Sequence, residues 1–252
     1  MSRNFEFLYQ VGKAQEMLQT TTEVEPTAVP LPDFSTSTPA LEIEGMARDE
    51  VTKLVHRLFL RPSAESPRQV IFTGTELGNG CTWICAHTAE ILASQVNKSV
   101  CVVDCNLRSP SLHQEFKVEN HFGLSNSLLE EGPIRQFARQ LSRKNLWLVS
   151  CGSLDENAQD LLTSDRMRMR MSELRAEFDY VLMDVAPLNL SNHGTVLGGF
   201  SDGVVLVLKA NSSRRDSTWE ITQQLQASNV RMLGAVLNQR TFPIPERIYN
   251  LL

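Results

Sequence analysis

A glycine-bearing loop in the first half of the chain has the residue types needed to bind an anion. It reads GTELGNGCT, Gly74–Thr82, and lies between a short apolar run, Gln69–Thr73, and a helical pattern. Glycines let successive backbone N–H groups face a phosphate, and a helix N-terminus adds the positive end of its dipole. The loop therefore predicts a phosphate cradle. An ordinary strand-to-helix turn would carry the same glycines, so the loop alone leaves both interpretations open.

Two aspartates end other apolar runs of the same kind. Asp104 closes Ser99–Asp104, and Asp184 closes Tyr180–Asp184. In an open α/β sheet, ligands bind at the carboxyl ends of the strands. We therefore expect Asp104, Asp184 and the glycine loop to meet in one crevice.

The elements that must position these residues alternate along the chain. Further apolar runs that predict strands are Leu146–Ser150, Gly203–Lys209 and Met232–Asn238. Helical patterns lie between the runs, at about Thr82–Val96, Ser164–Glu177 and Ser213–Ala227. Nearly continuous apolar strands between helices are typical of a parallel sheet covered on both faces. The predicted fold class is α/β, a mainly parallel, doubly wound sheet in a three-layer α/β/α arrangement.

The pattern divides the chain into three parts. Residues 1–19 have an apolar stripe at helical spacing and predict a short helix. Residues 20–42 are rich in proline and threonine and predict a disordered linker, because they cannot bury enough apolar surface to fold. Residues 43–252 hold the α/β pattern, preceded by a helix over Ile43–Leu60.

Composition excludes several classes of protein. The chain has 252 residues, 42% of them hydrophobic and 21% charged, as in globular domains. No apolar run reaches the roughly 18 residues of a membrane-spanning helix, and a net charge of −5 argues against nucleic acid as the main partner. Five cysteines, an odd number, and an N-terminus without a signal-peptide layout predict a reducing, cytoplasmic setting.

Three segments and one asparagine together follow the pattern of a known family. Leu77–Trp83, LGNGCTW, corresponds to a P-loop of the form P-G-E-G-K-T-T, and Asp104–His113, DCNLRSPSLH, to D-x-D-x-R-x-P-x-L-H. Leu182–Pro187, LMDVAP, is similar to the Walker B strand I-I-D-T-P-P, and Asn238 follows the last strand. From about residue 50 to 252, the chain resembles the cytoplasmic P-loop domain of bacterial tyrosine kinases of capsule and exopolysaccharide synthesis. That family belongs to the deviant-Walker ATPase group.

The resemblance implies a P-loop NTPase-like fold that binds ATP or ADP with Mg²⁺. Asp104 would be the base for an incoming tyrosine hydroxyl, and Asp184 the second catalytic carboxylate. Asn238 would read adenine. The implied nucleotide contacts are Gly78, Asn79, Gly80, Cys81, Thr82, Trp83 and Asn238, and the implied Mg²⁺ ligands are Thr82, Asn106 and Asp184.

Departures from the family pattern bear on catalysis. Cys81 replaces the P-loop lysine, Asn106 replaces the second aspartate of its motif, and Glu76 places a negative charge in the loop. The tyrosine-rich tail of the family is replaced by a segment with Tyr249 alone. Phosphoryl transfer depends on electrostatic placement, and removing one donor costs roughly a hundredfold or more in rate. We expect phosphotransfer to be weak or lost. The alternative is an active tyrosine autokinase or ATPase with an unusual phosphate site.

The resemblance also implies partners. Kinases of this family work with a membrane chain-length protein, the polysaccharide co-polymerase, which would hold this chain at the inner face of the membrane. They assemble into rings through an E-x-x-R-x-x-R helix, weakly echoed here by Glu50, Lys53 and His56. A homo-oligomer is therefore expected.

The cysteines invite a second interpretation. Cys81 with Cys85 and Cys101 with Cys105 form two C-x-x-x-C pairs, but Cys101 lies in a predicted buried strand, which favours packing over metal binding. For Cys81, a neutral filler is favoured over a thiol activated by the helix N-terminus.

Two further features predict surface rather than chemistry. His193, in LNLSNHG, is expected to be an exposed loop residue. Arg166–Met171, RMRMRM, predicts a partly buried helix with solvated arginines, because alternate residues spread around a helix axis.

Overall fold

The computed structural model describes residues 40–61, 66–153 and 158–240. The predicted N-terminal helix and nearly all of the predicted linker lie outside the described residues, as does Tyr249. The boundary at residue 43 stays a prediction.

Seven strands of the described residues form one sheet in the order β3-β4-β2-β5-β1-β6-β7. All neighbouring strands are parallel except β3, which pairs antiparallel with β4. The strands are β1 (Gln69–Gly74), β2 (Val100–Asp104), β3 (Arg139–Gln140), β4 (Leu146–Val149), β5 (Tyr180–Val185), β6 (Gly203–Lys209) and β7 (Met232–Asn238). Strands β1, β2 and β5 are buried at every position, as strands covered on both faces must be. The mainly parallel α/β prediction is confirmed.

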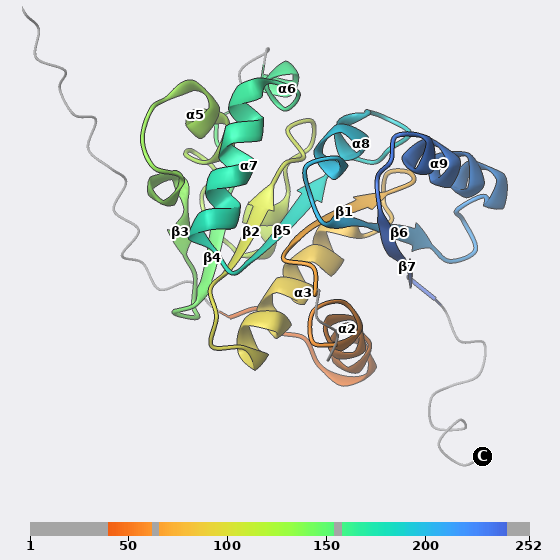
Figure 1. Ribbon diagram of the computed structural model, residues 1–252. Helices are drawn as coiled ribbons and strands as arrows, with labels where there is room; N and C mark the ends of the chain where they lie inside the picture. Colours follow the sequence, from red (N-terminus) through yellow and green to blue (C-terminus); the bar gives the residue numbers. More distant parts are fainter. Residues whose placement is uncertain (1–39, 62–65, 154–157, 241–252) are drawn as a thin grey trace, which may run out of the picture. The chain divides into compact units, whose positions relative to one another are not determined.

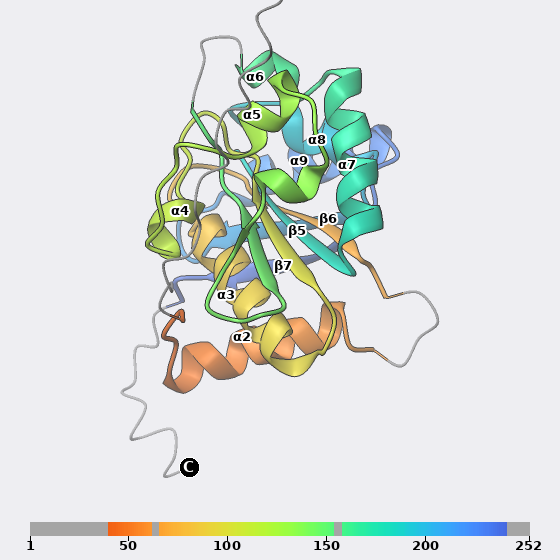
Figure 2. The same ribbon diagram turned by 90° about the vertical axis from the view of Figure 1, so that its left-hand side faces the viewer.

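Helices cover both faces of the sheet (Figure 1). They are α2 (Gly45–Leu58), α3 (Cys81–Gln95), α4 (Leu112–Glu115), α5 (Leu124–Leu129), the 3-10 helix η1 (Ile134–Phe137), α6 (Ala158–Leu161), α7 (Asp165–Glu177), α8 (His193–Gly198) and α9 (Arg215–Ala227). Apolar residues of α2, α3 and α4 share one core cluster with one face of the sheet, and those of α5, η1, α7, α8 and α9 share another with the opposite face. The view in Figure 2 shows α2 and α3 on the side away from α7.

The sequence analysis missed the short elements. Helices α4, α5, α6 and α8 have four to six residues each, and β3 has two. Such elements complete fewer than two helical turns or strand repeats, so no periodicity marks them. The longer helices lie within two residues of their predicted bounds.

The prediction for the arginines of Arg166–Met171 is wrong for one of them. Arg170 is 2% exposed, and its guanidinium donates hydrogen bonds to the carbonyl oxygens of Ser127, Glu130 and Gly132. It also pairs with Glu173 at 2.6 Å. A buried guanidinium is tolerated because these acceptors satisfy its donors. Arg170 thereby attaches α7 to the carbonyl groups at and beyond the end of α5.

The prediction for His193 is also wrong. The residue begins α8 and is half-buried rather than exposed in a loop. Burial lowers the pKa of its imidazole.

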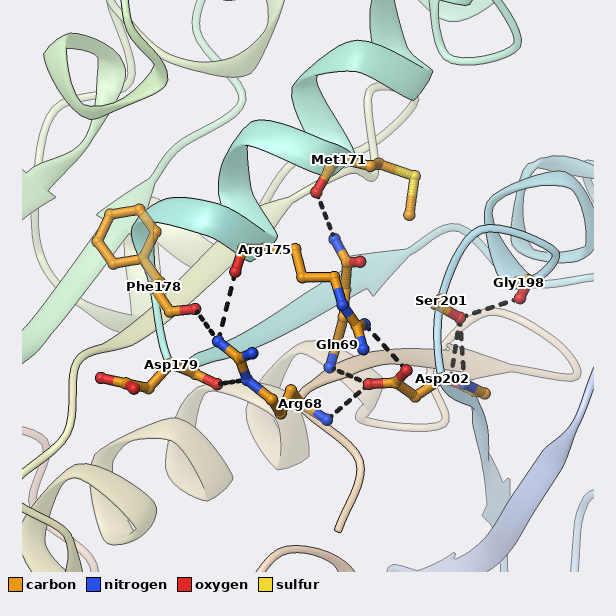
Figure 3. A network of polar contacts seen from close by, with 10 residues as sticks. Arg68, Gln69, Met171, Arg175, Phe178, Asp179, Gly198, Ser201 and Asp202 are labelled. Atoms are coloured by element: carbon orange, nitrogen blue, oxygen red, sulfur yellow. Dashed lines mark hydrogen bonds and ion pairs between the residues drawn. The ribbon is translucent and has the colours of Figure 1, made fainter. Parts of the chain in front are cut away.

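A polar network joins the amino ends of three strands, opposite the predicted crevice (Figure 3). The Asp202 carboxylate accepts the backbone N–H groups of Arg68 (2.7 Å) and Gln69 (2.9 Å) and binds the Arg175 guanidinium at 2.9 Å. The Arg68 side chain donates to the carbonyl oxygens of Asp179 and Phe178. The network therefore connects β1, β5 and β6 with the end of α7.

Asp202→Ala should lower the free energy of unfolding by about 2–3 kcal/mol, because it leaves two backbone donors and a guanidinium without their acceptor. Urea denaturation measures the change. Asp165→Ala is the matched control, since that side chain is 92% exposed and lies 3.7 Å from Arg168. It should change stability by less than about 1 kcal/mol. Equal effects of the two variants would contradict a stabilising role for the network.

Candidate nucleotide site

The three features expected to converge do meet at the carboxyl end of the sheet. Strands β2 and β5 are neighbours, and their register places Asp104 opposite Asp184. Strand β1 lies on the other side of β5 and runs into the glycine loop. The Thr82 hydroxyl, one residue into α3, donates a hydrogen bond to Asp184 Oδ2 at 2.6 Å. The predicted convergence of the three features is confirmed, whereas their role as a binding crevice stays a prediction.

The loop conformation requires glycine at two positions. Gly78 and Gly80 have φ values of 78° and 76°, in the left-handed region that other residues rarely adopt. A Cβ at Gly80 would also lie 2.3 Å from the Asn238 amide nitrogen. Gly80 is the N-cap of α3 and has no side chain to cap the helix. The N–H groups of the first turn are therefore left to an external acceptor such as phosphate.

Side-chain amides hold the loop against the sheet. Asn79 Nδ2 donates to Thr75 Oγ1 (3.1 Å) and to the Val207 carbonyl oxygen of β6 (2.7 Å). Asn238, at the end of β7, donates to the Asn79 carbonyl oxygen at 2.8 Å, and Gln239 donates to the Gly78 carbonyl oxygen at 3.0 Å. Asn238 thus lies next to the loop, where the expected adenine contact would place it. The adenine role itself stays a prediction.

Asp104 is buried and held by backbone donors. Its Oδ2 accepts the N–H groups of Ser111 and Leu112, and its Oδ1 accepts that of Asn106, at 3.0–3.1 Å. Burial, reinforced by the neighbouring Asp184 carboxylate, raises the pKa of Asp104 to about 8 despite these three donors. These effects favour the protonated form of Asp104 in the metal-free protein.

Asp184 is buried, and its two carboxylate oxygens differ in their partners. Its Oδ2 accepts the Thr82 hydroxyl, whereas the buried Oδ1 has no hydrogen-bond partner within the described part of the chain. Burial raises the pKa of Asp184, and side-chain hydrogen bonds from Thr82 and Cys81 oppose the change. A carboxylate oxygen lacking a partner beside a hydroxyl is a donor set that suits Mg²⁺. Thr82 and Asp184 fit the implied ion.

Asn106, the third implied Mg²⁺ ligand, already accepts a hydrogen bond through its side-chain oxygen. Asn106 is buried, and its side-chain oxygen accepts the N–H of Ser109 at 3.2 Å within its own turn. A metal would have to share that oxygen, which carries no formal charge. The role of Asn106 as a ligand stays a prediction.

Cys81 opens α3 without the properties of an activated thiol. Burial and the Asp184 carboxylate raise the pKa of its thiol well above the ordinary value. This direction favours a neutral filler over a thiol activated by the helix N-terminus, because desolvation and a nearby negative charge disfavour the thiolate. A neutral side chain therefore stands where a P-loop carries lysine.

The other cysteines pack in the core. Cys85, Cys101, Cys105 and Cys151 are buried, and all five thiols are free. Over residues 40–61, 66–153 and 158–240, no three or more His, Cys, Asp or Glu side chains are grouped so that they could hold a metal ion.

Glu76 lies within the loop, and Trp83 follows it. The Glu76 carboxylate accepts the Ser213 hydroxyl at 3.2 Å, which keeps its negative charge beside the loop. Trp83 is half-buried on α3, and its ring stacks on His87 with centroids 4.0 Å apart. Its predicted contact with nucleotide is untested.

Ser111 is a site residue that the sequence analysis did not single out. Its hydroxyl donates to Thr82 Oγ1 at 3.0 Å, and its N–H donates to Asp104. It thereby bridges the two carboxylates through Thr82. The available signal was its place between Pro110 and Leu112 in the aspartate motif, but only the fold brings it to α3.

The chain is similar in sequence to bacterial tyrosine-protein kinases. No protein-family model matches the chain. The tyrosine-protein kinase YwqD of Bacillus subtilis is 29% identical over 171 residues, which cover 68% of this chain and 72% of YwqD. The putative tyrosine-protein kinase EpsB of Ralstonia nicotianae is 30% identical over 169 residues, 67% of this chain. The match spans only 22% of EpsB, so it concerns one part of that longer protein.

Solved structures share the fold. The kinase domain of the Escherichia coli tyrosine kinase ETK has a TM-score of 0.76 at 22% identity, with 84% of each chain covered. The chimerical protein CapA2B2 has a TM-score of 0.73 at 20% identity, covering 81% of this chain and 96% of the other. The septum site-determining protein MinD of Pyrococcus horikoshii, complexed with Mg-ADP, has a TM-score of 0.58 at 17% identity and covers 73% and 77%. The fold is that of P-loop nucleoside triphosphatases.

Helices of the described ranges are too short or too polar to cross a membrane.

Proposed function

Because this chain is a homologue of the bacterial tyrosine-protein kinases, we propose that it is a kinase-like P-loop protein of exopolysaccharide or capsule assembly with weak or lost phosphotransfer. Its role would be to bind a partner and to regulate or assemble the export machinery. The observation that carries the proposal is the neutral Cys81 thiol, whose pKa is raised, at the position of the P-loop lysine.

The residues present support nucleotide binding more than turnover. The N–H groups at the start of α3 suit a phosphate, and Thr82 with Asp184 suits Mg²⁺. When bound, that ion would neutralise phosphate charge. The charge that the lysine would add to the transferring phosphoryl group is missing, and Glu76 adds a negative one. The loss should weaken nucleotide binding less than phosphoryl transfer. Positioned cations stabilise the charge on the phosphoryl group in the transition state.

The raised pKa of Asp104 also disfavours catalysis. A general base must be ionised to accept a hydroxyl proton. Burial and the Asp184 carboxylate raise the pKa of Asp104, which disfavours its ionised form in the metal-free site. Its three backbone donors fix its position but do not overcome this shift.

The proposed partner is a membrane polysaccharide co-polymerase, which would hold the chain at the cytoplasmic face of the membrane. The family resemblance of the motifs supports this partner, as does the similarity to kinases such as Wzc of Salmonella typhimurium, 24% identical over 169 residues. A homo-oligomer through α2 is the proposed assembly. On α2, Lys53 forms an ion pair with Glu50 at 2.7 Å. These two residues of the predicted ring-assembly motif therefore pair with each other within one helix.

One observation favours the second candidate, an active autokinase or ATPase. Asp104, Asp184 and Thr82 are all brought together, and Ser111 links them. A site that had lost every function would have no need to retain this arrangement.

Calorimetry with Mg-ATP and Mg-ADP, followed by an assay of phosphate release and autophosphorylation, separates the two candidates. We expect binding without turnover above background. Asp104→Asn is the control, because it removes the base without adding charge to the pocket. Turnover that depends on Asp104 would overturn the loss of phosphotransfer, and absence of binding would remove nucleotide from the proposal.

A further inference from the structure

A cleft of about 730 Å³ lies between α2 and the edge of the sheet, next to the phosphate loop. One wall is the face of α2 from Met46 to Leu58, continued by Arg61, and the other is residues 233–240 of β7 and the turn after it. Trp83 and Ile84 of α3 close one side. Both views place α2 and β7 near one another (Figures 1 and 2).

The cleft follows the outer edge of β7 rather than one face of it. Side chains alternate between the faces of a strand, yet every residue from Leu233 to Arg240 lines the cleft. Strand β7 is the last strand of the sheet in the described residues and pairs only with β6 there. Unlike the central strands, it leaves Ala235 and Leu237 exposed, Leu237 by 59%. An edge of this kind can accept an added strand.

The helix wall is basic above an apolar floor. Lys53, Arg57 and Arg61 are exposed and line the cleft, whereas Glu50 is the one acidic residue that lines it among those the structure describes. Glu50 binds Lys53 at 2.7 Å, so Arg57 and Arg61 carry the excess positive charge of this wall. This local charge is opposite to the net charge of −5 of the chain. The wall therefore complements an acidic ligand.

The spacing of the charges fits an extended ligand. Lys53 and Arg57 are four residues apart on α2, which corresponds to a rise of about 6 Å. Alternate residues of a strand are about 6.6 Å apart on one face. The lined part of α2 is about 18 Å long, and that of β7, Leu233–Asn238, is about 17 Å long by the same geometry. Acidic side chains at every second position could thus face successive cations of α2, and the intervening side chains would point to the opposite face of the sheet.

We propose that this cleft binds an extended, acidic segment of another protein as an added strand on β7. The backbone of the segment pairs with the β7 edge, and its alternate carboxylates face Arg57 and Arg61. Asn238 lines the cleft and also donates to the Asn79 carbonyl oxygen, so a bound segment contacts a residue that holds the phosphate loop. The inference does not depend on nucleotide binding or phosphotransfer, so its failure is distinct from failure of those parts of the proposed function. It requires that the homo-oligomer proposed through α2 leave this cleft open.

The test measures fluorescence anisotropy of a fluorescein-labelled peptide of about ten residues in which glutamate alternates with valine and isoleucine. We expect the whole chain to bind it, and Arg57→Glu to weaken binding at least about tenfold through like-charge repulsion. Arg48→Glu is the matched control, since Arg48 is exposed on the same helix but does not line the cleft. It should change affinity by less than about twofold. Thermal denaturation establishes that both variants fold.

Two further peptides separate charge from strand pairing. Replacing the glutamates by lysines should weaken binding at least about tenfold, and N-methylation of alternate amides should abolish it by removing backbone donors. Equal binding by Arg57→Glu or by the N-methylated peptide would overturn the proposal. Failure of the acidic peptide to bind would also overturn the proposal. If sedimentation then shows that the chain is an oligomer and that Arg57→Glu dissociates it, a second copy of the chain fills the cleft.

Discussion

The Cys81→Lys variant should bind ATP at least about tenfold more tightly than the parent protein. The loop already has its left-handed glycines, Gly78 and Gly80, and the free first turn of α3. Only the cationic contact is lacking. A lysine beside the β- and γ-phosphates would add about 1.5–3 kcal/mol through charged hydrogen bonds. Titration of Mg-ATP by calorimetry measures the change.

Cys81→Gln is the matched control, because glutamine lengthens the side chain without charge. It should leave the affinity within about threefold of the parent, since a neutral hydrogen bond to phosphate adds little net free energy. If the lysine variant binds ATP no better than the glutamine variant, the loop is not a P-loop that has lost its lysine. The functional proposal would then depend on the shared fold alone.

Turnover should recover less than binding in Cys81→Lys. Asn106 still offers a neutral oxygen that its own turn occupies, and Glu76 still stands beside the loop. Adding Asn106→Asp to the lysine variant tests the metal contribution directly. A phosphate-release rate that rises only in the double variant would assign the lost catalysis to both positions.

The second large effect concerns pH. In metal-free buffer, the free energy of unfolding should fall as pH rises towards 8, and Asp104→Asn should reduce this dependence. Burial and Asp184 raise the pKa of Asp104 from 3.8 to about 8 in the folded protein. Between these values the folded state binds more protons than the unfolded state, so raising the pH favours unfolding. One such group contributes no more than about 1.4 kcal/mol for each pH unit.

Urea denaturation between pH 6.5 and 8 measures this slope. The upper range is chosen because burial lowers the pKa of His113 and His193, which gives a slope of opposite sign below pH 6.5. Asp179→Asn is the control. Hydrogen bonds from Ser99 lower the pKa of Asp179, so its contribution is lost only as the pH falls below about 4. Parallel curves for the parent and Asp104→Asn would contradict a protonated Asp104.

The two effects are coupled through one carboxylate pair. A lysine at position 81 would stand near Asp184, whose charge helps to raise the pKa of Asp104. Cys81→Lys should therefore also reduce the dependence of stability on pH. The same charge that improves phosphate binding would return Asp104 towards its ionised form.

The sequence by itself determined the parallel sheet and the position of the site along the chain. The apolar run Gly203–Lys209 coincides with strand β6, whose first five residues are buried, because burial on both faces demands uninterrupted apolar residues. The run Met232–Asn238 coincides with β7 at the partly exposed edge of the sheet. The glycines of the loop are also local signals, since a positive φ selects glycine. The aspartates at the strand ends followed from the same pattern and the rule for ligand position.

Only the tertiary structure decided the burial, the pKa values and the hydrogen-bond partners of these residues. The order of the strands places Asp104 opposite Asp184, and the resulting burial raises the pKa of both carboxyl groups and of the Cys81 thiol. The contact of Ser111 with Thr82 joins residues 29 positions apart. Arg170 is buried because carbonyl groups near the end of α5 happen to face α7. Desolvation and hydrogen-bond partners depend on distances between elements, which no local pattern of residues encodes.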